Sequence, residues 1–193
     1  VKIQIGYDSR NSSPEICDLI VEGIKCVHHD FPYHITPHVS TPQLHYGFSK
    51  EHENTSYLEY VYNASKLVHT TCILDCANGI GARIMESIAN PHITLIHNDW
   101  KTPTKLNHLC SSDYVCTHKQ YPVIDGISDS EIQGQLCASF DGDADRIVFY
   151  SQIGDKLQLL NGDYIAALVF TYLSRQLAKC DRDLTIGYIY TGY

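Results

Sequence analysis

Short apolar segments alternate with polar loops along most of the chain. Residues 2–6 alternate polar and apolar side chains, which predicts a strand, and Pro14 directly after Ser13 predicts a helix capped by Ser13. Apolar residues at helical spacing predict further helices at about 56–67 and 162–178. Because strand-like and helix-like segments follow each other in turn, the pattern predicts an α/β fold.

The middle of the chain adds strands and one more helix. Apolar runs predict four strands, at 72–75, 93–96, 147–150 and 156–160. A helix is expected at about 82–88, the polar residues 47–56 are expected to form a linker, and residues 100–135 look rich in loops. The first helix of the chain is expected to carry one apolar face, made of Ile16, Leu19, Ile20, Gly23 and Ile24.

The loop before the 147–150 strand holds three carboxylates at alternate positions, followed directly by an arginine. These residues are Asp141, Asp143, Asp145 and Arg146. Gly142 and its small neighbour Ala144 allow a tight backbone curl, so the three side chains can converge into a cage of oxygens. Such a cage suits a hard divalent cation. An acidic loop that binds nothing is the alternative, but three aspartates in register beside an arginine favour a metal site.

The arginine points to a phosphate as a second ligand. A magnesium ion prefers a few carboxylates together with phosphate oxygens and water, and a guanidinium offsets the negative charge of that set. An EF-hand loop is excluded, because Arg146 stands where that loop needs glycine and Gln152 where it needs glutamate. A haloacid dehalogenase-type aspartyl nucleophile fits poorly with the third aspartate, the arginine and the immediate return to a strand.

Several segments resemble one known family. Asp-Gly-Asp-Ala-Asp-Arg at 141–146 is similar to the metal-binding loop of the α-D-phosphohexomutases. Gly-Tyr-Asp-Ser-Arg at 6–10 resembles a stretch of the first domain of these enzymes. Three further segments resemble the phosphoacetylglucosamine mutase branch: Ser-Thr-Pro-Gln-Leu-His-Tyr at 40–46, Asp-Cys-Ala-Asn-Gly-Ile-Gly-Ala at 75–82 and Leu-Asn-His-Leu-Cys at 106–110. The likeness extends over nearly the whole chain.

The resemblance implies a mechanism and a set of roles. In this family a phosphorylated serine gives its phosphoryl group to a sugar phosphate, with Mg²⁺ as the cofactor. By position, Asp141, Asp143 and Asp145 would be the metal ligands, and Arg146 would contact the phosphoryl or phosphoserine oxygens. Arg10 would be a further contact at the phosphoserine site, with a structural salt bridge to Asp8 as the alternative. The family's nucleophilic serine motif is absent from this sequence.

The resemblance also implies the domain organisation. The expected fold is α/β, with repeated phosphohexomutase-type domains whose mixed sheets are flanked by helices, and incomplete at both ends. Four regions are expected: 1–50 as the C-terminal part of domain I, 51–67 as a linker and helix, 68–182 as domain II with the metal loop, and 183–193 as the start of domain III. Without the phosphoserine and the sugar-binding loops, the chain alone is expected to be inactive.

Composition limits the partners. The net charge of −8 argues against a nucleic-acid partner, and no apolar run approaches the roughly 20 residues of a membrane span. The resemblance implies a small sugar phosphate as the partner. Eight irregularly spaced cysteines indicate reduced thiols and a cytoplasmic location, although three N-x-[ST] sequons point weakly the other way.

Two classes of function remain at this stage. The first is part of a phosphoacetylglucosamine mutase, which interconverts N-acetylglucosamine 6-phosphate and 1-phosphate on the route to UDP-N-acetylglucosamine; a sibling phosphoglucomutase or phosphomannomutase is the variant of this hypothesis. The second is a non-catalytic domain that keeps the fold and binds a metal ion. The intact aspartates and arginine favour descent from a working enzyme.

Overall fold

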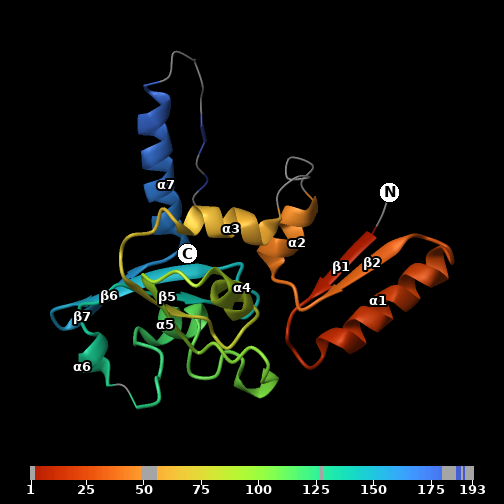
Figure 1. Cartoon of the computed structure of the whole chain (residues 1–193), viewed down its shortest axis with the longest axis horizontal. Coiled ribbons are helices and arrows are strands. Elements are labelled where there is room, and N and C mark those ends of the chain that lie inside the picture. Colours follow the sequence, from red (N-terminus) through yellow and green to blue (C-terminus); the bar gives the residue numbers. More distant parts are fainter. Residues whose placement is uncertain (1–2, 49–55, 127, 180–185, 188, 190–193) are drawn as a thin grey trace.

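A computed structural model gives the fold of the protein (Figure 1). It describes residues 3–48, 56–126, 128–179, 186–187 and 189. Two sheets organise these residues: a parallel pair of strands near the N-terminus, and a mixed sheet of five strands formed by the later residues. The predicted α/β class, with a mixed sheet flanked by helices, is therefore confirmed. None of the helices in the described ranges is both long and apolar enough to span a membrane.

The N-terminal part consists of a strand, a helix and a strand. β1 (Ile3–Tyr7) pairs in parallel with β2 (Tyr33–Pro37), and α1 (Ser13–Val27) connects them. Pro14 lies in the first turn of α1, as predicted, but the N-cap is Ser12 and not Ser13. The Ser13 hydroxyl instead donates to Asp8 Oδ1, at 2.9 Å. The Ser13 side chain thus bonds to the loop after β1.

The buried face of α1 differs from the predicted one. Cys17 and Val21 pack with Ile5 of β1 to form the core of this part, whereas Ile16 and Leu19 remain exposed. The helix carries apolar residues around much of its circumference, so periodicity alone does not identify the face that meets the strands.

Two short helices follow β2. α2 (Thr41–Phe48) was not predicted, and its last two residues fall within the linker expected at 47–56. α3 (Tyr57–Ser65) begins as predicted, with the Ser56 hydroxyl accepting the Glu59 backbone N–H at 3.2 Å. Figure 1 shows α2 between the two sheets and α3 above the five-stranded sheet.

The five-stranded sheet has the order β4-β3-β5-β6-β7. Its strands are β3 (Cys72–Asp75), β4 (Ile93–Ile96), β5 (Cys137–Phe140), β6 (Ile147–Ile153) and β7 (Lys156–Leu160). β4, β3 and β5 are parallel, whereas β5, β6 and β7 form antiparallel pairs. The loop between β5 and β6 is therefore a direct antiparallel connection, which brings the three aspartates to one edge of the sheet.

Helices cover both faces of this sheet. α4 (Gly81–Ile88) packs on one face through Ala82, beside Leu74 of β3. On the other face, α5 (Ser112–His118) contributes Val115 to a second core with Tyr150 of β6. A 3₁₀ turn (Pro103–Lys105) and α6 (Asp129–Ile132) complete this part. The region expected to be loop-rich thus contains short helices that place buried side chains.

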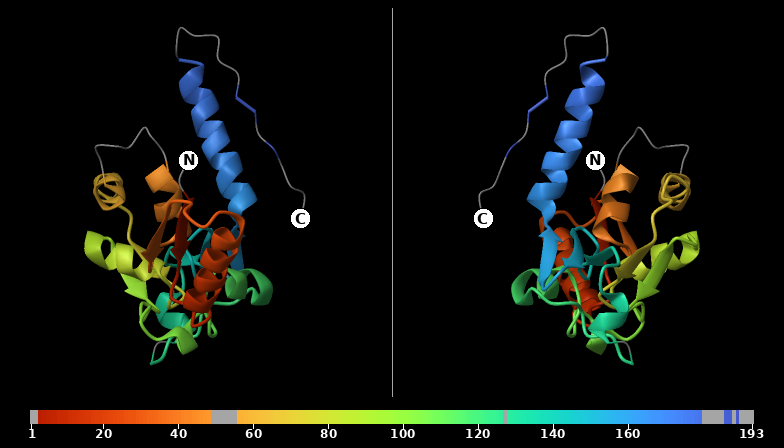
Figure 2. Two further views of the ribbon diagram at one scale, coloured as in Figure 1. Left: turned by 90° about the vertical axis from the view of Figure 1, so that its right-hand side faces the viewer. Right: turned by 90° about the vertical axis from the view of Figure 1, so that its left-hand side faces the viewer.

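α7 (Gly162–Leu177) extends away from the rest of the protein in both views of Figure 2. Asn161 caps it as the side chain accepts the Tyr164 N–H, at 3.3 Å. Its apolar residues, such as Leu168 and Tyr172, are exposed, and no residue of this helix is buried. The expected start of a third domain at 183–193 lies almost entirely outside the described residues.

Candidate metal centre

The loop between β5 and β6 brings its three aspartates together. One carboxylate oxygen from each of Asp141, Asp143 and Asp145 lies within 4.8 Å of the others. Asp141 organises the loop, because its Oδ1 accepts the backbone N–H groups of Asp145 at 3.1 Å and Arg146 at 3.2 Å. Ala144 takes the left-handed conformation, with φ of 58°. The predicted convergence of the side chains therefore has a local cause in the turn that Asp141 closes.

Space is tight around two glycines at this loop. A Cβ on Gly142 would lie 3.1 Å from Leu106 and 3.3 Å from Asn107, both in the segment that covers the loop. From the other direction, a Cβ on Gly79 would lie 2.3 Å from the Gly142 carbonyl oxygen. The Ile80 N–H donates to that same oxygen, at 3.1 Å. The glycine-rich turn before α4 thus packs on the metal loop and fixes its backbone.

Arg146 bridges the metal loop and α5. Its Nε donates to Asp141 Oδ2 at 2.9 Å, while Nη1 and Nη2 donate to the two oxygens of Asp113 at 2.6 and 2.9 Å. Sequence reasoning missed Asp113, since one acidic residue in the first turn of a helix is common and carries no signal of its own. The Arg146 side chain is 57% exposed, so the guanidinium is also open to solvent.

The carboxylates differ in their affinity for protons. Burial raises the pKa of Asp141, but hydrogen bonds from Arg146 outweigh that effect and lower it overall. The pKa of Asp145 is raised by burial and by its interaction with Asp141. The hydrogen bonds with Asp113 raise the pKa of Arg146, which therefore stays charged. The loop concentrates negative charge that one guanidinium offsets only in part.

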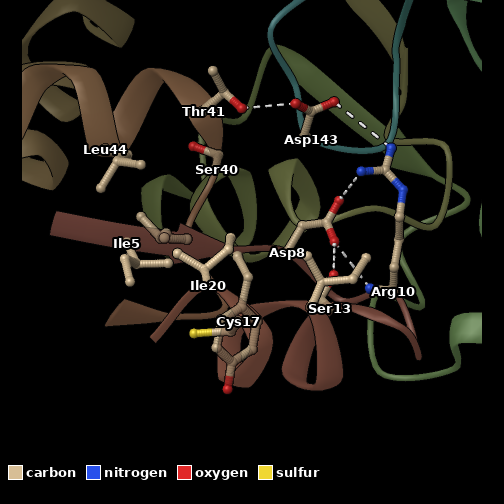
Figure 3. Close-up of a pocket in the computed structure, with 14 residues that line it drawn as sticks. Ile5, Asp8, Arg10, Ser13, Cys17, Ile20, Ser40, Thr41, Leu44 and Asp143 are labelled. Carbon is tan, nitrogen blue, oxygen red and sulfur yellow. Dashed lines mark hydrogen bonds and ion pairs between the residues drawn. The ribbon is translucent and has the colours of Figure 1, made fainter. Parts of the chain in front are cut away.

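Residues of the N-terminal part complete the surroundings of the loop (Figure 3). Thr41 Oγ1 donates to Asp143 Oδ2 at 2.7 Å. Arg10 lies between Asp8 and Asp143: its Nη1 is 2.6 Å from Asp8 Oδ2, and its Nη2 is 4.0 Å from Asp143 Oδ1. The expected salt bridge with Asp8 is therefore present and holds the guanidinium beside the cage, whereas the contact of Arg10 with a phosphoserine stays a prediction. A pocket of about 230 Å³ opens here, lined by Arg10, Thr41 and Asp143.

A second group of possible ligands, Asp75, His97 and Cys110, lies at the end of β3. The buried Asp75 carboxylate already accepts hydrogen bonds from the N–H groups of Ala77 and Ser111, at 2.8 Å each, from the Ser139 hydroxyl at 2.8 Å and from His97 Nδ1 at 3.0 Å. With these donors the carboxylate is satisfied, so this group is a structural hydrogen-bond centre.

Both ring nitrogens of His97 are engaged in that centre. Its Nδ1 faces Asp75 and its Nε2 lies 2.9 Å from the Val123 carbonyl oxygen, so both nitrogens face acceptors. Burial lowers the pKa of His97, but the hydrogen bond to Asp75 and its charge outweigh burial and raise it overall. Burial and the Asp75 charge raise the pKa of the adjacent Cys110 thiol to about 12. The thiol therefore stays protonated at neutral pH, and the imidazolium form suits both of the histidine's contacts.

The donor set of the loop fits magnesium. All three candidate ligands are carboxylates from one short loop, and hard oxygen donors of this kind suit Mg²⁺ or Ca²⁺. Two partly exposed guanidiniums, those of Arg10 and Arg146, flank the cage with side-chain exposures of 49% and 57%. Cations beside a hard-metal cage can bind the oxygens of a phosphate held at the same place.

Comparison with known proteins gives a consistent result. Residues 35–148 match the family described as phosphoacetylglucosamine mutase AMG1, domain II. The chain is 32% identical to the phosphoacetylglucosamine mutase of Sus scrofa and 33% identical to that of Homo sapiens, in each case over 99% of this chain and 38% of the relative. The chain thus spans little more than a third of the length of these relatives.

Solved structures agree with the sequences. A crystal structure of N-acetylglucosamine-phosphate mutase, a member of the α-D-phosphohexomutase superfamily, in a substrate complex aligns with a TM-score of 0.75 at 27% identity, over 94% of this chain and 37% of the other. The Aspergillus fumigatus N-acetylphosphoglucosamine mutase in complex with GlcNAc-6P and magnesium aligns with a TM-score of 0.71 at 26% identity, over 93% and 40%. Sequence and fold lead to the same conclusion: this chain belongs to the phosphoacetylglucosamine mutase family.

Proposed function

We propose that this chain is the magnesium-binding part of a phosphoacetylglucosamine mutase. The parent protein would interconvert N-acetylglucosamine 6-phosphate and N-acetylglucosamine 1-phosphate, which supplies the precursor of UDP-N-acetylglucosamine. The observation that carries the proposal is the convergence of Asp141, Asp143 and Asp145 with two flanking arginines. Family membership and the solved relative that holds GlcNAc-6P and magnesium support the substrate and the metal.

Each residue of the centre has a defined task in this proposal. Asp141, Asp143 and Asp145 would hold Mg²⁺, which supplies charge withdrawal from a phosphoryl group in transfer. Arg146 would hold phosphoryl oxygens while Asp141 and Asp113 fix its direction. Arg10, held by Asp8, would contact the phosphoserine from the opposite side of the cage.

The domain boundaries and the location of the parent belong to the same proposal. Residues 1–50 would end domain I, 51–67 would link it to domain II at 68–182, and 183–193 would begin domain III. The serine that carries the phosphoryl group would lie in another part of the parent, which makes the parent a phosphoprotein. A cytoplasmic location is supported by the seven cysteines in the described ranges, all of which are free thiols.

The test uses the longest polypeptide that the transcript encodes around these residues, with the 193-residue chain beside it. The long polypeptide should convert N-acetylglucosamine 6-phosphate to the 1-phosphate in Mg²⁺, lose turnover in EDTA, and lose it in Asp143→Asn. The chain alone should bind Mg²⁺ without turnover. Asp155→Asn, an exposed aspartate in the β6–β7 turn, is the matched control.

Three results would contradict the proposal. If Asp143→Asn leaves Mg²⁺ binding intact, the loop is not the metal site. If the long polypeptide binds Mg²⁺ but prefers glucose or mannose phosphates as substrates, the chain belongs to a sibling activity. Metal binding without any mutase activity would leave a non-catalytic metal-binding protein.

A further inference from the structure

Thr41 makes two hydrogen bonds to the candidate metal ligand Asp143, although 102 residues separate them in the sequence. Its Oγ1 donates to Asp143 Oδ2 at 2.7 Å, and its backbone N–H donates to the Asp143 carbonyl oxygen at 3.2 Å. Figure 3 shows Thr41 above the pocket, with its hydroxyl directed at this carboxylate. Thr41 opens α2, so the contact joins the N-terminal part to the metal loop.

Two of the candidate ligands, Asp141 and Asp143, are held in different ways. Asp141 is fixed within its own loop by three donors: the N–H of Asp145 and both the N–H and the Nε of Arg146. For Asp143, the described residues show one donor to the carboxylate within hydrogen-bond distance, the Thr41 hydroxyl; Arg10 lies further away, at 4.0 Å. The direction of the Asp143 carboxylate therefore depends on a residue outside the loop.

Capping of α2 does not explain the Thr41 hydroxyl. The Gln43 N–H in the first turn of α2 donates to Ser40 Oγ at 3.3 Å, and Ser40 is 1% exposed. Ser40 thus performs the N-cap role, which requires a side-chain oxygen as acceptor. Thr41 uses its hydroxyl as a donor, and the partner is the carboxylate.

We propose that Thr41 is a positioning residue, which orients Asp143 for divalent-cation binding and links α2 to the metal loop. The inference rests on the proposed role of Asp143 as a magnesium ligand. A carboxylate that ligates a metal through one oxygen keeps its direction when a neighbour donates to the other oxygen, or to the second lone pair of the same one. Loss of such an outer partner typically reduces metal affinity by about 10–100-fold.

The test measures Mn²⁺ binding to the 193-residue chain by electron paramagnetic resonance, with Mg²⁺ as the competitor. Thr41→Val keeps the shape of the side chain and the backbone bond, and removes only the hydroxyl. It should weaken Mn²⁺ binding by about 10–100-fold. Thr41→Ser restores a hydroxyl and should retain most of the affinity. Thr171→Val removes a threonine hydroxyl that donates to the Ala167 carbonyl in α7, and should leave binding unchanged.

Urea unfolding without metal separates positioning from a general structural role. The proposal expects Thr41→Val to lose affinity with little change in metal-free stability. It is overturned if Thr41→Val binds Mn²⁺ like the wild type, or if Thr41→Ser loses affinity to the same extent. Asp143→Asn is measured in parallel: if it still binds Mn²⁺ normally, the assignment of the metal ligands fails, which is a different result from the failure of Thr41.

Discussion

Arg146 and Asp113 form a bidentate ion pair that joins the metal loop to α5. The two hydrogen bonds measure 2.6 and 2.9 Å, and 33 residues separate the partners in the sequence. The third donor of the guanidinium, Nε, is used by Asp141. An arginine bound on both edges has a fixed plane, so the direction of its remaining N–H groups is set by the protein.

The first prediction concerns this pair. Asp113→Asn should lower mutase turnover of the parent by roughly 10–100-fold, which is the usual loss when a hydrogen-bond partner of a metal-site residue is removed. Its free energy of unfolding should change by less than about 1 kcal/mol, because both side chains are largely exposed. Turnover and urea unfolding are measured together, with Asp155→Asn as the control. Equal turnover in the wild type and Asp113→Asn would show that Asp113 does not set the position of Arg146.

The second prediction concerns the packing of the glycine-rich turn on the metal loop. In Gly79→Ala the new Cβ would meet the Gly142 carbonyl oxygen, a backbone atom that cannot move without shifting the loop. The free energy of unfolding of Gly79→Ala should be about 1–3 kcal/mol lower than that of the wild type. Gly23→Ala is the matched control, because no atom lies within 4 Å of the Cβ that it adds. Its free energy of unfolding should rise by about 0.5–1 kcal/mol, since alanine favours the helix α1 more than glycine does. Equal urea midpoints for Gly79→Ala and the wild type would exclude the clash.

The third prediction concerns the buried Asp75 carboxylate. In Asp75→Asn an amide N–H₂ group replaces one oxygen and faces donors, so at least one buried hydrogen bond is lost along with the charge opposite His97. The free energy of unfolding should fall by about 3–5 kcal/mol, which is the range found when one partner of a buried ion pair is removed. Urea unfolding monitored by circular dichroism measures it. A cost below that of the exposed control, Asp155→Asn, would show that the centre at the end of β3 carries little stability.

The fourth prediction is a pH dependence from His97. The pKa of His97 is higher in the folded protein than in the unfolded chain, where a histidine has a pKa of about 6.5. The contribution of His97 to stability is therefore complete below about pH 6.5 and is lost as the pH rises through the folded-state pKa. Wild-type stability relative to His97→Gln should therefore decrease as the pH rises above about 6.5. The two proteins carry the same cysteines, so ionisation of thiols in the unfolded chain cancels in this difference. Parallel pH profiles for the two proteins would contradict the protonated pair.

The sequence predicted the elements that local physics controls. The strand at 72–75 and the helix at 162–178 were confirmed almost to the residue, because their periodicity and their capping residues are local. α2 was missed, since its start depends on the buried Ser40 cap and it contains few apolar residues at helical spacing. The prediction of the buried face of α1 was wrong for a related reason. Several faces of that helix are apolar, and only the contact with β1 selects the one that is buried.

By itself, the sequence determined the family, the α/β class and the convergence of Asp141, Asp143 and Asp145, because a six-residue loop between paired strands leaves little freedom to its side chains. The tertiary structure alone decided that Thr41 of α2 and Asp113 of α5 each hydrogen-bond to a residue of this loop. Single polar residues at distant positions have no pattern of their own. They become recognisable when the packing of two sheets and their helices brings them within hydrogen-bond distance of the loop.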